Sequence, residues 1–355
     1  MEPAALSAAR REELQQDLCD QGFFILSPEE LRWDEPPMRA LCAAAAALRA
    51  HGWPATLLLM YDEAWWVCNR LSDVMREVSG NANCFDILAW CVSAAAGESG
   101  FAPHRDRQPV DVPGSFRSDG SPRYTTAWVA LSEASARTGC LYLLPKSVDP
   151  GYSVGDPTDA DADPLHVALR SDAAVQAVRA CHVDAGGVVA FSHRVMHWGS
   201  TGDTRARTSR VSLSFGCSDG EFEPSYFQDP SAHLPFPRVG VRAALAGAQL
   251  INYHERFDFG AARLRALASM FRAERRHFSE SYVQKTAAEL KSAVEDRAKS
   301  KANDAHASAR AAADDGDDGD EDDDALDDAL DAMLDAQASS GANLFDDFDE
   351  LESHR

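Results

Sequence analysis

The chain has 355 residues, 45% of them hydrophobic, and a formal net charge of -23 at pH 7. Eighteen acidic residues and a single Arg lie between Asp314 and Arg355, so this segment carries -17 of the charge and the rest only -6. The length and apolar share predict one large domain with a proper core plus appendages. The mildly acidic body argues against a nucleic-acid-binding protein, because no excess of positive charge is available for phosphates.

The eight cysteines are scattered without a C-x-x-C pair, and several sit in apolar runs. This usage is typical of buried thiols in a reducing, intracellular compartment, which we expect to be the cytoplasm, and it argues against a disulfide framework or a zinc site. The sequence contains no stretch of about 18 apolar residues, so we expect no membrane span. The first residues lack the basic and apolar regions of a secretory signal, while an organelle address stays open.

Apolar spacing predicts a mainly helical start to the chain. The expected elements are a helix over 6–20, a strand over 22–26, a helix over 37–51 and an aromatic-rich element over 61–79. Leu14 and Leu18 fall on the inner face of the first helix. The aromatic cluster of Tyr61, Trp65 and Trp66 is expected in the core, with the wall of a hydrophobic substrate pocket as the alternative.

Short strands separated by turn signals dominate the middle of the chain. The predicted strands cover 85–92, 124–131, 139–145, 181–184, 186–191 and 210–215. Many short strands at such spacing favour a double-stranded β-helix, which is a jelly-roll or cupin-like barrel, with a core over about 84–220. The fold class is therefore mainly β with flanking helices (α+β). The loops over 107–123 and 146–178 are expected to border a binding site.

The C-terminal part changes character twice. Residues 243–300 have helical periodicity, and residues 301–355 form an Ala- and Asp-rich segment for which the composition predicts a disordered acidic tail. Two apolar islands, over 325–334 and 344–351, interrupt the acidic run. The tail is interpreted either as a solubilising segment or as a protein-binding motif that folds on contact.

Two short motifs carry the candidate chemistry. His104 and Asp106 stand two residues apart, and His197 follows after a long interval. Residues i and i+2 of an extended strand share a face, so His104 and Asp106 can reach one metal ion while His197 closes the third corner from a neighbouring strand. Two imidazoles and one carboxylate on one face form the set that holds non-haem Fe(II) and leaves the other positions open.

The order of these elements resembles the phytanoyl-CoA dioxygenase family of Fe(II)/2-oxoglutarate oxygenases over roughly residues 10–220. The stretches that carry the resemblance are Gly22-Phe23-Phe24-Ile25-Leu26, His104-x-Asp106, Ala127-Trp128-Val129-Ala130-Leu131 with Gly139-Cys140-Leu141 and Leu144-Pro145-x-Ser147, and Gly187-Val188-Val189-Ala190-Phe191 leading to His197 and Arg210. The resemblance implies an oxygenase domain over residues 1–300. It also implies that His104, Asp106 and His197 hold Fe(II), with 2-oxoglutarate and O2 as co-substrates.

The far carboxylate of 2-oxoglutarate requires a buried guanidinium, because a planar fork makes two charge-assisted hydrogen bonds to it. Arg210 opens an alternating strand just after His197, and Arg207 is the nearby competitor. We favour Arg210 because Ser212 lies on its own face and offers a hydroxyl to the same carboxylate. Thr126 is a further candidate for lining the site.

Other residues near the motifs have alternative interpretations. His193 lies four residues before His197, but the family pattern places the ligand immediately before Trp198-Gly199-Ser200. His182 is interpreted as a structural histidine. Arg105 and Arg107 flank the ligand segment and are expected to be solvated or paired with the acidic loop, with recognition of an anionic substrate as the less favoured alternative.

The chain departs from the family in one turn, where Leu144-Pro145-Lys146-Ser147-Val148 lacks the family's glycine and histidine. We expect this departure to alter the loop over the site and to leave the metal set intact. Because Asp106 leaves no room for a halide, hydroxylation or a related oxidation of a small or lipid-like molecule is the predicted activity. The alternatives are a non-catalytic jelly-roll scaffold that acts through its tail and, less favoured, a protein or nucleic-acid hydroxylase.

Overall fold

The computed structural model describes residues 6–33, 35–108, 114–156, 163–257 and 259–312. Internal contacts divide the chain into two compact units, Met1–Arg238 and Val239–Arg355. The sequence instead favoured one domain over 1–300, with the C-terminal helices as part of it. That assignment of the helices stays a prediction, and each unit is described by itself.

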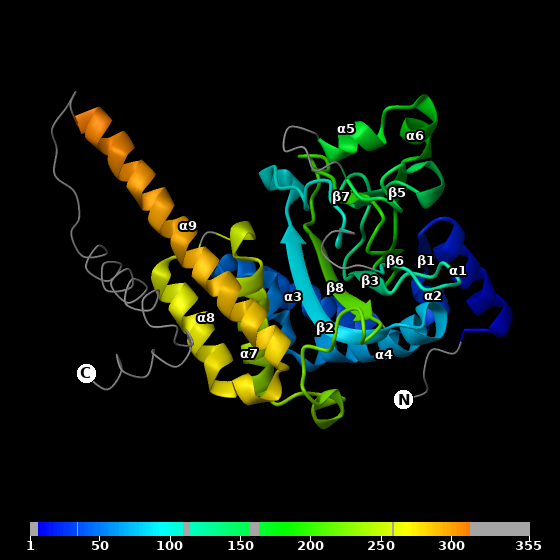
Figure 1. Cartoon of the computed structure of the whole chain (residues 1–355), viewed down its shortest axis with the longest axis horizontal. Helices are drawn as coiled ribbons and strands as arrows, with labels where there is room; N and C mark the ends of the chain where they lie inside the picture. The colour runs from blue at the N-terminus through cyan, green and yellow to red at the C-terminus, as the bar shows by residue number, and fades with distance from the viewer. Residues whose placement is uncertain (1–5, 34, 109–113, 157–162, 258, 313–355) are drawn as a thin grey trace. The chain divides into compact units, whose positions relative to one another are not determined.

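The elements of the first unit appear in Figure 1 from blue to green. Its helices are α1 (Ala8–Asp20), α2 (Pro28–Leu31), α3 (Glu35–Ala50), α4 (Asp62–Ser79), α5 (Pro164–Ala168) and α6 (Asp172–Ala177). Its strands are β1 (Phe23–Leu26), β2 (Ala82–Val92), β3 (Tyr124–Ala130), β4 (Leu141–Leu143), β5 (Arg179–Cys181), β6 (Val188–Ser192), β7 (His197–Gly199) and β8 (Arg210–Ser218). The predicted helices and strands are thus present, with ends that differ by a few residues.

Five strands form the main sheet in the order β1-β6-β3-β8-β2, with every described neighbouring pair antiparallel. Figure 1 shows these strands side by side. A smaller antiparallel sheet has the order β5-β4-β7. Two antiparallel sheets with flanking helices confirm the predicted jelly-roll fold.

The register assigns side chains to the two faces of the main sheet. Ser212 lies opposite Ala130 and Ser214 lies opposite Trp128, so β8 and β3 present these residues on one face. Arg210 belongs to the same face because side chains alternate along β8. We call this the inner face, because the candidate ligand Asp106 contacts it through Thr126.

Helix α4 packs on the other face of the main sheet, against β2, β3 and β8. Trp65 of α4 is fully buried and packs against the rings of Phe85 and Phe227. Its indole N–H donates to the carbonyl of Leu59 at 2.7 Å. The core interpretation therefore applies to Trp65, which lies on the side of the sheet away from the candidate ligands.

Strand β2 contains an irregularity between Asn83 and Ile87, where its pairing register with β8 shifts. Phe85 adopts a positive φ of 68° there, which is rare for an aromatic residue. Its N–H donates to the side chain of Asn83 at 2.8 Å. Bulges of this type bend a strand and re-aim the residues that follow, and Asp86 comes next, with a buried carboxylate.

The second unit is helical where the structure describes it, with α7 (Val239–Asn252), α8 (Ala261–Glu274) and α9 (Glu280–Ala312). Phe271 of α8 packs against Tyr282 of α9, whose hydroxyl donates to Gln249 of α7 at 2.8 Å. Helical backbone continues to Ala312, whereas the composition favoured disorder from residue 301. The apolar islands over 325–334 and 344–351 lie outside the described residues. Among the described residues, no helix is both long and apolar enough to span a membrane.

Candidate metal centre

A single backbone bridge brings the two predicted histidine ligands together. His104 N–H donates to His197 O and His197 N–H donates to His104 O, both at 3.0 Å. We expected a strand at His104, but the pairing is an isolated bridge. The register slips on either side of it, because Gly199 N–H bonds Phe101 O and Arg107 N–H bonds His193 O.

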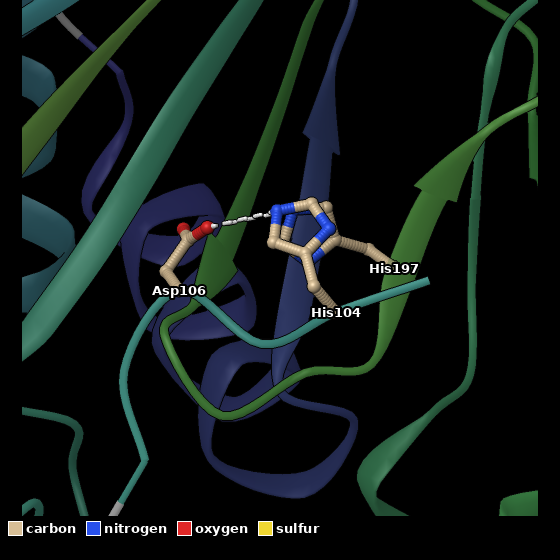
Figure 2. Close-up of side chains that lie close together, drawn as sticks. All are labelled: His104, Asp106 and His197. Carbon is tan, nitrogen blue, oxygen red and sulfur yellow. Dashed lines mark ion pairs between the residues drawn. The ribbon is translucent and has the colours of Figure 1, made fainter. Parts of the chain in front are cut away.

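The side chains of His104, Asp106 and His197 converge on one point (Figure 2). Asp106 Oδ1 lies 3.6 Å from His104 Nε2 and 3.5 Å from His197 Nε2. One donor atom from each residue lies within 4.8 Å of the other two. Residues separated by about ninety positions in the chain therefore offer two nitrogens and one oxygen to a common centre.

Backbone carbonyls orient both imidazoles. His104 Nδ1 lies 2.7 Å from Ala102 O, and His197 Nδ1 lies 3.0 Å from Val195 O. A carbonyl oxygen only accepts, so each Nδ1 is the donor, and in the neutral ring the Nε2 lone pair is directed at the shared centre. Metal-binding histidines are commonly fixed by a hydrogen bond of this type on the other ring nitrogen.

Electrostatics keep the cluster in its ligand form. Burial raises the pKa of Asp106, but the neighbouring His197 and His104 and the hydroxyl of Thr126 outweigh it and hold that pKa well below the usual value. Burial, followed by the charge of His104, lowers the pKa of His197 to about 4. At neutral pH the site thus holds a carboxylate and a neutral imidazole at these two positions, as a divalent cation requires.

Thr126 acts on the carboxylate directly. Its hydroxyl donates to Asp106 Oδ2 at 2.5 Å, which leaves Oδ1 facing the two imidazoles. Thr126 was a candidate for lining the site, and β3 presents it on the inner face beside Asp106. Its contact with the co-substrate stays a prediction.

Arg210 lies further along the inner face and is only 3% exposed. Its Nη1 donates to Ser212 Oγ at 2.7 Å, its Nε donates to Gly139 O at 3.0 Å, and its guanidinium stacks on Trp128. Burial lowers the pKa of Arg210 to about 10, so the group stays charged at neutral pH. No described carboxylate pairs with Arg210, which is unusual for a buried guanidinium.

Glycines surround this guanidinium. A Cβ added at Gly100 would lie 3.2 Å from Arg210 Nη2 and 2.8 Å from the backbone of Gly199. Gly139 has a positive φ of 92°, and its carbonyl is the acceptor of Arg210 Nε. A buried cation with neutral partners, next to backbone without side chains, fits a small dicarboxylate such as 2-oxoglutarate.

The competitor Arg207 is exposed, and Arg205 is exposed and paired with Asp203 at 3.0 Å. Neither side chain has the burial that a carboxylate clamp requires. Between the two arginines that the sequence left as alternatives, burial and the bond to Ser212 favour Arg210.

The two other histidines that the sequence analysis considered, His193 and His182, lie outside the cluster. His193 is fully buried and bonds Tyr124 O through Nδ1 at 2.8 Å, and burial lowers its pKa to about 4. His182, which we interpreted as a structural histidine, is exposed, with its Nε2 3.9 Å from Glu133 Oε1.

For Arg105 and Arg107 the sequence left open whether they are solvated or paired with acidic residues. Arg105 is buried and binds Asp149 and Asp156 of the loop after β4, so the expected pairing with an acidic loop is present but the solvated alternative is wrong. Arg107 donates three hydrogen bonds of 2.7 to 2.9 Å to Glu223. No local pattern signals this burial, because the acidic partners are distant in sequence.

The turn that departs from the family pattern is anchored to the N-terminal helix. Lys146 N–H donates to Gln21 O at 2.8 Å, and its ammonium donates to Cys19 O at 2.7 Å. The ammonium thus lies at the C-terminal end of α1, where a positive charge is favourable.

Comparisons with known proteins assign the family. The family model for phytanoyl-CoA dioxygenase (PhyH) matches residues 4–210, more than half of the chain. A search of curated proteins finds no match.

Solved structures with a similar fold include three whose descriptions name iron or α-ketoglutarate. The non-haem α-ketoglutarate-dependent epimerase SnoN from nogalamycin biosynthesis is 19% identical, with 60% of this chain and 85% of that chain covered and a TM-score of 0.44. The carbocyclase SnoK from nogalamycin biosynthesis is 17% identical, with 62% of this chain and 87% of that chain covered and a TM-score of 0.45. EctD from S. alaskensis with bound Fe is 15% identical, with 62% of this chain and 79% of that chain covered and a TM-score of 0.43. The family assignment does not depend on these distant likenesses. By its match to the family model, the chain belongs to the phytanoyl-CoA dioxygenase family and is an Fe(II)- and 2-oxoglutarate-dependent oxygenase.

Proposed function

We propose that His104, Asp106 and His197 hold Fe(II) in a dioxygenase that oxidises a small or lipid-like organic molecule. The convergence of two imidazole nitrogens and one carboxylate oxygen carries this proposal. The set fits Fe(II) because two imidazoles and a carboxylate occupy one side of the ion and leave positions for exogenous ligands. Bound Fe(II), with 2-oxoglutarate and O2, supplies the oxidising equivalent for substrate oxidation while 2-oxoglutarate is decarboxylated to succinate and CO2.

Within this proposal, Arg210 and Ser212 bind the far carboxylate of 2-oxoglutarate. The bond between them already fixes the guanidinium, so little side-chain freedom is lost when the co-substrate binds. Gly100 and Gly199 leave space beside Arg210 that a larger residue would fill. Thr126 supports the centre indirectly by fixing the orientation of Asp106.

Aromatic residues near the metal cluster support an organic substrate with an apolar part. Trp90 and Phe101 are both half-buried and meet edge to face, with ring centroids 4.6 Å apart. The Phe101 ring lies 5.5 Å from the ring of His104. Partly exposed rings beside a reactive centre provide favourable contact area for carbon skeletons. The presence of Asp106 favours hydroxylation, desaturation or ring closure over halogenation, since the carboxylate occupies the position that a halide requires.

The test is succinate release from 2-oxoglutarate by the purified protein, with and without Fe(II). We expect release that depends on Fe(II), is weak without substrate, and rises when a substrate from a fractionated metabolite extract is added. A protein that binds neither Fe(II) nor 2-oxoglutarate would contradict the proposal and would revive the alternative of a non-catalytic scaffold. An Asp106→Ala variant that keeps full turnover would contradict the ligand assignment alone.

We also propose that the protein works in a reducing compartment such as the cytoplasm, without nucleic acid as a partner. All eight cysteines are free thiols, and burial raises the pKa of several of them, for example Cys68.

The acidic tail is proposed to bind a protein partner through its two apolar islands, and an interaction screen with a peptide covering 313–355 tests this. Loss of oxygenase activity on deleting that segment would instead assign it to the catalytic unit.

A further inference from the structure

Three buried charged residues and one half-buried carboxylate form a network beside the candidate metal centre and take no part in the proposed ligand set. They are Arg105, Asp149, Asp156 and Arg194. Each of the two segments that supply metal ligands contributes one arginine, because Arg105 stands between His104 and Asp106 and Arg194 precedes His197 by three positions. The two carboxylates come from the loop that follows β4, so the group is neutral as a whole.

Arg105 joins three segments of chain. Its Nη1 and Nη2 donate to the two carboxylate oxygens of Asp149 at 2.6 and 2.9 Å, and its Nε donates to Asp156 at 2.8 Å. Nη1 also donates to the backbone carbonyl of Arg194 at 2.5 Å. The side chain from one ligand segment thus holds the backbone of the other.

Arg194 makes the reciprocal contact. Its Nη1 donates to Arg107 O at 2.7 Å, in the segment that carries Asp106. Its Nε and Nη2 donate to Tyr152 O and Gly151 O, both at 3.0 Å. The two arginines therefore brace the ligand segments against each other and against the same loop.

The backbone of that loop is shaped to receive Arg105. A Cβ added at Gly151 would lie within van der Waals overlap of the Arg105 guanidinium, 3.1 Å from its Cζ. Gly151 N–H also donates to Asp149 Oδ1 at 2.9 Å, which holds the carboxylate in place for Arg105. Since Gly151 has no positive φ in the structure, the guanidinium is the main reason for a glycine there.

Energetics argue that this network serves positioning more than stability. Burying charges costs free energy that their pairing recovers only in part, so apolar residues of similar size are often as stable. Such networks are retained where they specify one arrangement of the chain. Here that arrangement sets the separation of the segments that carry His104, Asp106 and His197, which a metal site tolerates only within a fraction of an ångström.

We propose that Arg105 and Arg194, braced by Asp149 and Asp156, are positioning residues that fix the metal-binding geometry before the ion arrives. The inference rests on the proposed function, because it assigns the network a role toward the same metal centre. It predicts that disturbing the network weakens metal binding by more than it weakens the fold, although none of the four side chains is a ligand. A purely structural network would lower the melting temperature and leave the metal affinity unchanged.

The experiment titrates the purified, metal-free full chain with Co(II) alone and records the d–d absorption of the bound ion, with the melting temperature measured in parallel. The test variants are Arg105→Gln, which removes the charge, and Gly151→Ala, which displaces the guanidinium and keeps every charge. We expect each to raise the Co(II) Kd by about tenfold or more and to alter the absorption, as for residues that orient metal ligands.

Two control variants match these changes. Arg117→Gln removes a half-buried arginine with contacts to Asn81 and Pro122, away from the metal centre. Gly220→Ala adds a methyl group at a glycine with nothing within 4 Å of its Cβ position. We expect Co(II) Kd values within about twofold of the wild type for both.

The outcomes separate the two proposals. If the wild type binds Co(II) and the folded Arg105→Gln and Gly151→Ala variants bind it equally well, the positioning role is wrong and the proposed metal site stands. If Arg105→Gln fails to fold, Gly151→Ala decides by the same criterion. A wild-type protein that binds no divalent metal overturns the proposed function itself, and with it the inference.

Discussion

The two ends of the inner face hold their charges in opposite ways. At the metal end, Asp106 is surrounded by two imidazoles and the hydroxyl of Thr126, and the cluster is assembled by the protein's own contacts. At the other end, Arg210 is buried with only neutral acceptors, Gly139 O and Ser212 Oγ. The first end brings its donors together, whereas no carboxylate of the described residues pairs with the charge at the second end.

This difference suggests how the two exogenous groups are bound. A metal ion needs several donors held in a fixed geometry, and hydrogen bonds from the protein orient each ligand. A flexible dicarboxylate needs one strong anchor and open space, and a buried guanidinium flanked by glycines provides both. Substitutions at the metal end should therefore affect ion binding, and those at the Arg210 end should affect the affinity for 2-oxoglutarate.

The largest effect is expected for Asp106→Ala. Loss of the only carboxylate in the cluster should reduce succinate release by on the order of a thousandfold, or about 4 kcal/mol in the activation barrier. The control is Asp119→Ala, at an exposed position. Turnover assays at saturating Fe(II) and 2-oxoglutarate measure both, and equal rates for the two variants would remove Asp106 from the site.

The second-largest effect is expected at Arg210, the proposed binding residue for 2-oxoglutarate. Arg210→Ala should raise the KM for 2-oxoglutarate by about 100-fold with a smaller change in kcat, because a buried charge pair is lost. Arg207→Ala is the matched control, since its side chain is exposed, and it should leave the KM unchanged. Initial rates over a range of 2-oxoglutarate concentrations decide between the two arginines. A larger shift for Arg207→Ala would reverse the assignment.

Lowering the pH should affect the histidines at and near the metal site but not Arg210. With a pKa of about 10, Arg210 stays charged throughout. Burial lowers the pKa of both His193 and His197 to about 4 from 6.5. Below pH 6.5 the unfolded chain takes up protons that the folded chain does not, so the stability of the metal-free protein falls as the pH drops toward 4. We expect a loss on the order of 1–2 kcal/mol per histidine between pH 7 and 5.

Urea unfolding of the metal-free protein at several pH values measures this loss. His193→Gln removes one of the two groups and retains an amide donor for Tyr124 O. The variant should therefore show a shallower pH dependence than the wild type. Parallel curves for the two proteins would mean that His193 is not held neutral by the fold.

The smallest effect concerns Thr126→Val, which removes one hydrogen bond to Asp106 and keeps the shape of the side chain. We expect Co(II) affinity to fall severalfold, by about 1 kcal/mol. Thr125→Val is the control, because Thr125 lies on the other face of β3 and bonds Asn81 and Ser79. That control should lower stability and leave Co(II) affinity as it is, and an equal loss of affinity in both would exclude a specific role for Thr126.

Local patterns in the sequence were sufficient for most of the fold. Alternation along 210–215 placed Arg210 and Ser212 on one face, and β8 presents them so. The strand predicted at 85–92 was less complete, because β2 begins at Ala82 and contains the irregularity at Phe85. A bulge with a positive φ depends on how Phe85 packs against Trp65 and Phe227, which no local pattern reveals.

By itself, the sequence determined the donor types and their spacing, His104-x-Asp106 with a distant His197, since these are properties of neighbouring residues. Only the tertiary structure decided that an isolated bridge joins His104 to His197, that Thr126 bonds Asp106, and that Arg105 is buried. Each of these depends on residues that lie between 20 and 93 positions apart in the chain. Such contacts form because folding brings distant segments together, and most buried charges and donors are stable only when they have a partner.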